Sequence, residues 1–183
     1  MKQFYRVIKR QHLKTRKLDE ISKGKVYDFL KIDVQGYELE VLKNGIKTLL
    51  DVSAVHIEVS FVQKYTSQPL FRDIDYFLSN LGFKFHCFTG YGTRTPKTIY
   101  INNNPVSGIN QWLWADAVYF KDIDNKEFWN YKDQLIKFAL IAHHIYQSYD
   151  YAAYALKKYD HTNHTFYLKN YLMFLAANKG SVQ

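Results

Sequence analysis

Residues 31–45 read KIDVQGYELEVLKNG and join a strand to a helix through a sharp turn. The strand is predicted over Val26–Val34, a short hydrophobic run rich in β-forming residues that Gln35-Gly36 interrupts. After the turn, Tyr37–Leu50 repeats apolar residues at spacings of three and four, which is typical of one helical face. These features predict a strand–helix–strand unit in which the first strand lies parallel beside the next one.

The alternation of strands and helices continues from this stretch to residue 120. Val52–Phe61 is predicted as the next strand, and apolar spacing over residues 70–81 predicts a helix that Gly82 ends. Phe83–Phe88 and Leu113–Phe120 are predicted as two further strands. The pattern favours an α/β fold with a Rossmann-like, mostly parallel sheet. Because the connection between the last two strands has no helical pattern, the C-terminal strand is expected to pair antiparallel.

The remaining sequence is predicted to be helical. Apolar residues keep helical spacing from Leu135 to Leu156, and a second helix is predicted over Phe166–Asn178. Two successive helices of this kind favour a helical hairpin appended to the sheet. We therefore predict two units, an α/β domain over residues 1–124 and a helical hairpin extension over residues 125–183.

The composition fits a folded chain of about one domain. Hydrophobic residues make up 47% of the 183 residues, and the net charge is +8. Residues 1–31 hold ten Lys or Arg residues and three acidic ones, a surface that attracts phosphate or is simply solvated. No nucleic-acid-binding motif accompanies this charge, so no nucleic-acid partner is predicted. The single cysteine, Cys87, and the lack of a membrane-spanning apolar run favour a cytoplasmic protein.

The turn after the first strand brings together three residues suited to a functional site. In an open α/β sheet, ligands bind beyond the carboxyl ends of the strands, where Asp33 stands. A carboxylate there can orient a hydroxyl, act as a base or hold a metal ion. Gly36 permits the sharp turn, and Glu38 opens the helix. The structural alternative is that Asp33 caps that helix and Glu38 complements its dipole.

The next strand adds two polar side chains near the same edge. His56 and Glu58 are two residues apart and therefore share one face of the strand. Together with Asp33 they could bind Mg²⁺ or a similar hard ion. The alternative for His56 is a histidine that simply finds a partner within the sheet. Tyr91 and Trp112, in the long connection, could stack on a sugar ring or fill the core.

Residues 31–45 resemble the most recognisable block of FkbM-type methyltransferases, in which a Lys-Ile-Asp strand end leads through a glycine turn to a glutamate and an EVLKG-like run. Other segments resemble further elements of that family in the same order, so that the resemblance covers about residues 13–121. These segments are Leu18-Asp19-Glu20, His56-Ile57-Glu58-Val59, Gly82-Phe83 and Trp114-Ala115-Asp116-Ala117-Val118.

The resemblance implies an S-adenosylmethionine-dependent methyltransferase that methylates a hydroxyl, with a sugar or glycan as the expected acceptor. Asp33 is then expected to orient the hydroxyl as a base or to hold a divalent metal, with Glu58 as its neighbour. Gly36 would let the backbone approach the substrate, Glu38 would organise the turn, and His56 would lie beside them. Such catalysis depends mainly on positioning the two reactants.

The chain departs from the family pattern before Asp33. Members of the family begin with a strand and an acidic-Gly-x-Gly turn that bind the cofactor, whereas Gly24 is the only glycine that precedes Asp33 here. Gly90-Tyr91-Gly92 is no substitute, because it follows a later strand and opens no helix. We therefore expect the C-terminal half of the domain, present as a fragment, a split gene product or a degenerate copy, which does not bind S-adenosylmethionine appreciably by itself.

Two consequences follow for partners. The strand at residues 26–34 would have an unpaired edge, which the basic N-terminal segment, another copy or a separate chain with the cofactor half is expected to cover. The competing hypothesis is a non-catalytic binding or scaffold module, in which the helical hairpin docks a partner. Binding of S-adenosylmethionine distinguishes the enzyme from the module.

Overall fold

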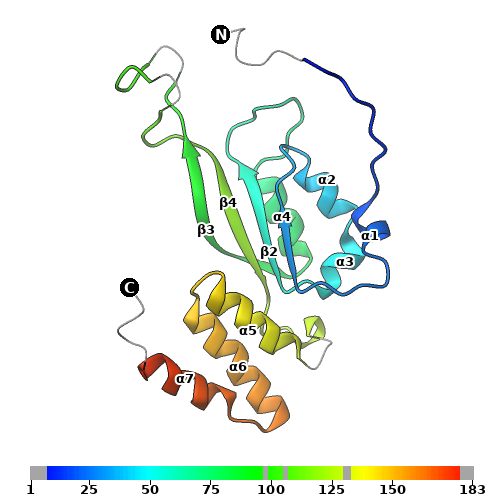
Figure 1. Ribbon diagram of the computed structural model, residues 1–183, viewed down its shortest axis with the longest axis vertical. Helices are drawn as coiled ribbons and strands as arrows, with labels where there is room; N and C mark the ends of the chain where they lie inside the picture. Colours follow the sequence, from blue (N-terminus) through cyan, green and yellow to red (C-terminus); the bar gives the residue numbers. More distant parts are fainter. Residues whose placement is uncertain (1–7, 97–98, 105–106, 130–132, 178–183) are drawn as a thin grey trace.

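The computed structural model describes residues 8–96, 99–104, 107–129 and 133–177, and shows a four-stranded sheet with helices packed against it (Figure 1). In chain order the elements are α1 (Leu18–Ile21), β1 (Phe29–Ile32), α2 (Glu38–Lys43), α3 (Ile46–Asp51), β2 (Ala54–Ser60), α4 (Phe71–Asn80), β3 (Phe83–Thr93), β4 (Trp112–Lys121), the 3-10 helix η1 (Lys126–Phe128), α5 (Gln134–His144), α6 (Tyr149–Asn163) and α7 (Tyr167–Ala177). None of the helices in these residues is long and apolar enough to cross a membrane.

The sheet has the strand order β1-β2-β4-β3. β1 and β2 are parallel neighbours, with Ile32 level with Ile57, which confirms the predicted strand–helix–strand unit. β4 runs antiparallel to β3, as predicted, but it also lies antiparallel to β2. The expectation of a mostly parallel sheet is therefore wrong, and the sheet is mixed. The reason is that β4 returns between β2 and β3, so that β2 and β3, which run in the same direction, are not neighbours.

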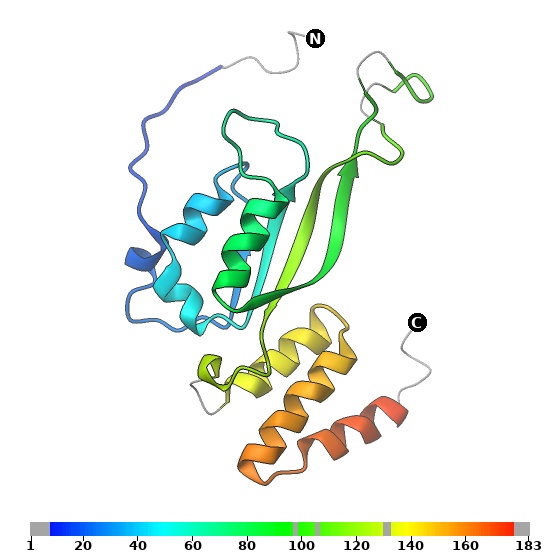
Figure 2. The same cartoon turned by 180° about the vertical axis from the view of Figure 1, so that it is seen from behind.

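Two apolar clusters, one on each face of the sheet, hold the elements together. The helices that contribute to them, α2 to α4 and then α5 and α6, can be followed by colour in Figure 2. On one face, α2, α3 and α4 cover the apolar side of β2; this cluster includes Leu42, Leu49, Val55, Ile57, Val59, Ile74 and Leu78. On the other face, α5 and α6 pack where β2 begins and β4 ends; this cluster includes Ala54, Val118, Phe120, Phe138, Ala142 and Ala152. The boundary at residue 124 stays a prediction, although the second cluster extends across it.

The helix predicted over Tyr37–Leu50 is divided into α2 and α3 at Gly45. A side chain at Gly45 would overlap Leu18, because a Cβ there would lie 2.6 Å from Leu18 Cδ2. The next residue, Asp19, caps α3 by accepting hydrogen bonds from the backbone N–H groups of Lys47 and Thr48 at 3.2 and 2.9 Å. Burial alone would raise the pKa of Asp19, but these bonds outweigh it and lower the pKa. α1 thus fixes the position at which α3 begins.

The C-terminal part contains three helices rather than the predicted two. The single helix expected between Leu135 and Leu156 ends as α5 and starts again as α6. Gln147 takes a left-handed backbone conformation between them, with φ 53°, and the Ser148 N–H donates to the Ala142 carbonyl at 2.9 Å. α5 and α6 therefore form the hairpin, and α7 packs on α6 as an additional helix.

Candidate functional site

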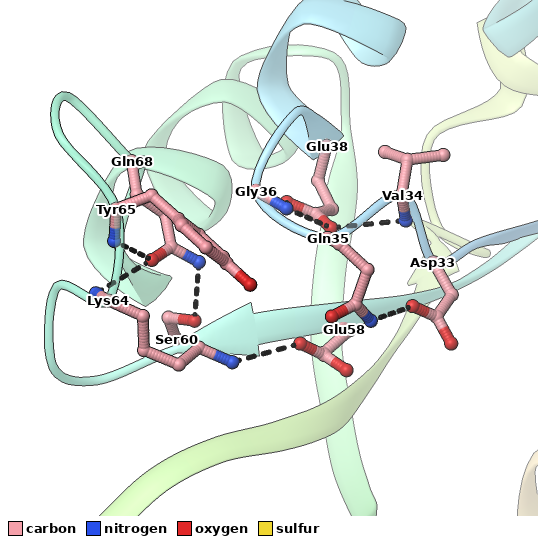
Figure 3. Close-up of polar contacts among 10 residues, drawn as sticks. All are labelled: Asp33, Val34, Gln35, Gly36, Glu38, Glu58, Ser60, Lys64, Tyr65 and Gln68. Atoms are coloured by element: carbon pink, nitrogen blue, oxygen red, sulfur yellow. Dashed lines mark hydrogen bonds and ion pairs between the residues drawn. The ribbon is translucent and has the colours of Figure 1, made fainter. Parts of the chain in front are cut away.

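The turn between β1 and α2 is built around the carboxylate of Glu38 (Figure 3). This carboxylate accepts hydrogen bonds from the backbone N–H of Val34 at 3.2 Å and from that of Gly36 at 3.0 Å. Glu38 is only 4% exposed, although it stands in the first turn of a short helix. Gln35 and Gly36 both have positive φ, 54° and 107°, which favours glycine at the second position. Glu38 therefore holds a turn that the backbone would not otherwise prefer.

Asp33 follows β1 directly and is exposed. Its carboxylate accepts a hydrogen bond from Gln35 Nε2 at 2.8 Å. The residue that precedes α2 is Tyr37, and no side chain caps this helix. Asp33 is therefore no helix cap, and its carboxylate is fixed by a single neutral amide at the carboxyl end of the strand.

Glu58 lies near the carboxyl end of β2, at the same edge of the sheet as Asp33. Ile32 pairs with Ile57 in the parallel register of β1 and β2. One residue further along each strand, Glu58 is therefore level with Asp33. Lys64, from the loop after β2, contacts the Glu58 carboxylate at 3.4 Å. In Figure 3 the Gln35 amide is drawn between the Asp33 and Glu58 carboxylates. The two predicted acids therefore end neighbouring strands, and each already has its own partner.

His56 occupies the same face of β2 as Glu58 but lies closer to the helical hairpin. Its Nδ1 is 3.1 Å from the Tyr146 hydroxyl, and its Nε2 is 3.6 Å from Asp116 Oδ1. Burial, followed by the charge of Lys31, lowers the pKa of His56, although Asp116 opposes this shift. His56 Nδ1 therefore links β2 to the segment after α5, whereas its Nε2 is buried and has no hydrogen-bond partner among the described residues.

Asp116 is a residue of this surface that sequence reasoning did not select. It stands on β4 directly opposite Glu58, and Gly90 on β3 leaves space beside its carboxylate. The sequence predicts a strand over Leu113–Phe120, and the alternation along it places Asp116 on one face. What the sequence did not supply was the register that sets Asp116 against Glu58.

The described residues offer no metal centre. Among them, no group of three or more His, Cys, Asp and Glu side chains could hold a metal ion. The expected set of Asp33, Glu58 and His56 does not converge, because each side chain is engaged by a different partner. The expectation of a divalent metal at Asp33 and Glu58 therefore finds no support in this geometry.

A cleft of about 800 Å³ opens beside Gly36. One wall is the Gln35–Tyr37 turn, and the other is the loop after β2, which Gln68 holds in place. The Gln68 side chain accepts hydrogen bonds from the Lys64 and Tyr65 N–H groups and donates to Ser60 Oγ at 2.9 Å. Tyr37 and Tyr65 are 70% and 54% exposed, so that aromatic rings from both walls face solvent. The cleft thus combines two aromatic side chains with several neutral polar groups.

Tyr91 and Trp112, which could stack on a sugar ring or fill the core, contact each other. The rings of Tyr91 and Trp112 stack with centroids 4.4 Å apart and nearly parallel planes. Trp112 also packs edge-on against Phe61 and Phe88, in the cluster beneath α4. Trp112 is therefore part of the hydrophobic core, and the ring of Tyr91 packs on Trp112.

Two backbone N–H groups at the β1–α2 turn are not free to bind a ligand such as S-adenosylmethionine, the cofactor that the resemblance implies. An anionic group of a ligand favours free backbone N–H groups where a helix begins. At this turn, the N–H groups of Val34 and Gly36 already donate to Glu38. The Glu38 carboxylate therefore already occupies both of these N–H groups.

Comparison with known proteins gives one match. Residues 3–85 match a family model described as the Methyltransferase FkbM domain, a family that generally uses S-adenosylmethionine. No curated protein and no solved structure matches the chain. The match runs from the N-terminal segment to the start of β3, and it includes the Asp33–Glu38 turn and the whole of β2. The match confirms the resemblance to FkbM methyltransferases that residues 31–45 carry, and it covers residues 3–85 of the 183 residues.

Proposed function

We propose that this chain binds the acceptor in an FkbM-type methyl transfer, and that the acceptor is a hydroxyl group of a sugar or glycan. The observation that supports this is the cleft beside Gly36. Its volume suits a small ligand, and exposed Tyr37 and Tyr65 can pack against the apolar faces of sugar rings. The exposed amide of Gln35 adds a polar group that can bind hydroxyl groups.

The charges around the cleft favour a neutral ligand over a phosphate or a cation. Glu40 and Lys43 both line the cleft and pair with each other at 2.9 Å. Asp73 lines it as well, and its carboxylate lies 3.7 Å from Arg72 Nε and accepts a hydrogen bond from the Leu70 N–H at 2.8 Å. Because these charges are already balanced locally, a polyhydroxyl ligand that hydrogen-bonds without carrying charge is the best match.

Asp33 is our candidate for the group that orients the acceptor hydroxyl and accepts its proton. It is exposed at the strand end, and the single bond from Gln35 leaves acceptor capacity on the carboxylate. Glu58 is its neighbour and is held by Lys64. We place the methyl donor outside the β1–α2 turn, where the Val34 and Gly36 N–H groups already donate to Glu38.

We further propose that a separate chain, or another copy, contributes that missing part by pairing with β1. Within the described residues, β1 pairs only with β2 and is an edge of the sheet. Residues 8–17, the described part of the basic N-terminal segment, have no regular structure and are exposed. In Figure 1 this segment runs away from β1 past α2, which argues against its covering the edge. An open edge strand is a surface on which another strand can add.

Acceptor binding is tested by titrating neutral mono- and disaccharides and following the protein by NMR. We expect shifts at the Gly36 turn and the Gln68 loop, and at least tenfold weaker binding in the Tyr37→Ala and Tyr65→Ala variants. Tyr76→Ala is the matched control, because Tyr76 is 74% exposed on α4 but does not line the cleft. Equal binding by all three variants would remove the cleft as the acceptor site.

The alternative of a non-catalytic binding or scaffold module has one observation in its favour. α7 is rich in apolar residues, yet none of its residues is buried, and Leu172, Met173 and Phe174 are exposed. An apolar helix in that state is suited to docking a partner. Calorimetric titration with S-adenosylmethionine at near-millimolar concentration tests whether the chain is a complete enzyme: we expect no appreciable binding by this chain alone. Stoichiometric micromolar binding would restore a complete enzyme as the simplest interpretation.

A further inference from the structure

A second cleft lies at the other end of the strands, away from the carboxyl ends of β1 and β2 that carry Asp33 and Glu58. Its volume is about 730 Å³, and it opens where β4 ends, between η1 and the second half of α6. Since β4 is antiparallel to β2, this end of β4 is level with the start of β2, at Ala54. The cleft lies beyond the residues that match the family model, so the family gives no role for it. We call it the Trp129 cleft, after the residue in its floor.

The floor of the Trp129 cleft is apolar and firmly held. Trp129, Leu135 and Ile123 contribute to its lining. The indole Nε1 of Trp129 donates to the Asp122 carbonyl at 3.0 Å, and its ring packs edge-on against buried Phe138 with centroids 5.5 Å apart. An aromatic ring fixed at its polar end and at one side provides a rigid surface for a planar ligand.

The rim of the Trp129 cleft is positively charged. Three lysines, Lys126, Lys157 and Lys158, line it, whereas Asp124 is its single acidic residue. Asp124 is already bound by Lys158 at 2.8 Å and by the Tyr154 hydroxyl, and these bonds lower the pKa of Asp124. Lys126 and Lys157 have no ion-pair partner within the residues that the structure describes. Two ammonium groups are therefore left to attract an anion.

We propose that the Trp129 cleft binds a nucleoside phosphate. Lys126 and Lys157 contact the phosphate groups, and the base lies against Trp129. The volume is in the range of pockets that enclose such ligands. Lysine is a common phosphate ligand, and aromatic side chains bind bases by stacking without reading their sequence. This site is separate from the acceptor cleft beside Gly36, which lies at the opposite end of the strands. The charged side chains that line the acceptor cleft are balanced locally.

The experiment is a titration of the full chain with ADP, adenosine and inorganic phosphate, followed by calorimetry and tryptophan fluorescence. We expect ADP to bind more tightly than either part alone and to quench the fluorescence of Trp129. The Trp129→Phe variant should lose the quenching, because Trp112 and Trp114 stand at the opposite end of β4. Circular dichroism confirms that each variant is folded.

The charge requirement is tested with a Lys126→Ala/Lys157→Ala double variant, for which we expect at least tenfold weaker ADP binding. Lys169→Ala removes an exposed lysine from α7, outside the cleft, and should leave the affinity unchanged. A Lys9→Ala/Arg10→Ala variant tests the basic N-terminal segment in the same way. Absence of ADP binding at millimolar concentration overturns the proposal. So does equal binding by the Lys126/Lys157 variant, or loss of binding in the N-terminal variant instead.

Discussion

Replacing Glu38 should destabilise the fold through the turn that carries Asp33. The Glu38 carboxylate is buried and accepts hydrogen bonds from two backbone N–H groups, those of Val34 and Gly36. Hydrogen bonds to a charged group contribute ~1.5–3 kcal/mol each. Because solvent can reach part of this turn, we take the lower end for both bonds. Glu38→Ala should therefore lower the free energy of unfolding by about 3 kcal/mol, and Glu38→Gln, which keeps one acceptor oxygen, by about half as much.

The assay is equilibrium unfolding in urea, followed by circular dichroism, with Glu40→Gln as the matched control. Glu40 lies two residues further along the same helix, but it is exposed and forms only an exposed ion pair with Lys43. That pair is expected to contribute less than ~0.5 kcal/mol. If Glu38→Ala cost no more than Glu40→Gln, the turn would not depend on the Glu38 carboxylate, and the reasoning would be refuted.

Three further predictions concern pH and backbone conformation. Burial lowers the pKa values of His56 and His86, so the unfolded state binds more protons than the folded state as the pH falls through about 6.5. Urea unfolding should therefore show a free energy of unfolding that declines below that pH, and that declines less in a His56→Gln/His86→Gln variant. Burial lowers the pKa of Lys121 from 10.5 to about 8. The free energy of unfolding should therefore rise from pH 8 towards pH 10 by up to ~3 kcal/mol relative to that of Lys121→Met. The same pH profile in the wild-type protein and in Lys121→Met would contradict this. Gly82→Ala should destabilise the fold by about 1–2 kcal/mol because of its positive φ, and by ~1–3 kcal/mol more because the new Cβ overlaps Phe128. Gly24 also has a positive φ but lies in open space, so Gly24→Ala should show only the first of these losses in thermal unfolding.

Several features of the site could be predicted from the local sequence. The order Asp33, Gly36, Glu38 marks a strand end, a turn and a helix start, and the structure has all three in those places. The parallel pairing of β1 with β2 followed from their short helical connection. The alternation along β2 placed His56 and Glu58 on one face. The functional roles of these residues, and of Asp33, stay predictions.

Other features depended on contacts between residues far apart in the sequence. The break between α2 and α3 comes from Leu18, which occupies the space where a side chain at Gly45 would lie. The burial of His56 beneath Tyr146 depends on how the helical hairpin packs on the sheet. Neither can be read from apolar periodicity, because the periodicity of a segment does not record which partner covers it.

The sequence by itself determined where most strands and helices form and which side chains stand at the carboxyl end of β1 and β2. Those properties depend on the alternation of apolar residues and on turn residues such as Gly36, which act within a few positions of the chain. Only the tertiary structure decided that β4 enters between β2 and β3 and brings Asp116 opposite Glu58. Strand order depends on the free energy of packing whole faces together, and that energy comes from residues that the local pattern does not connect.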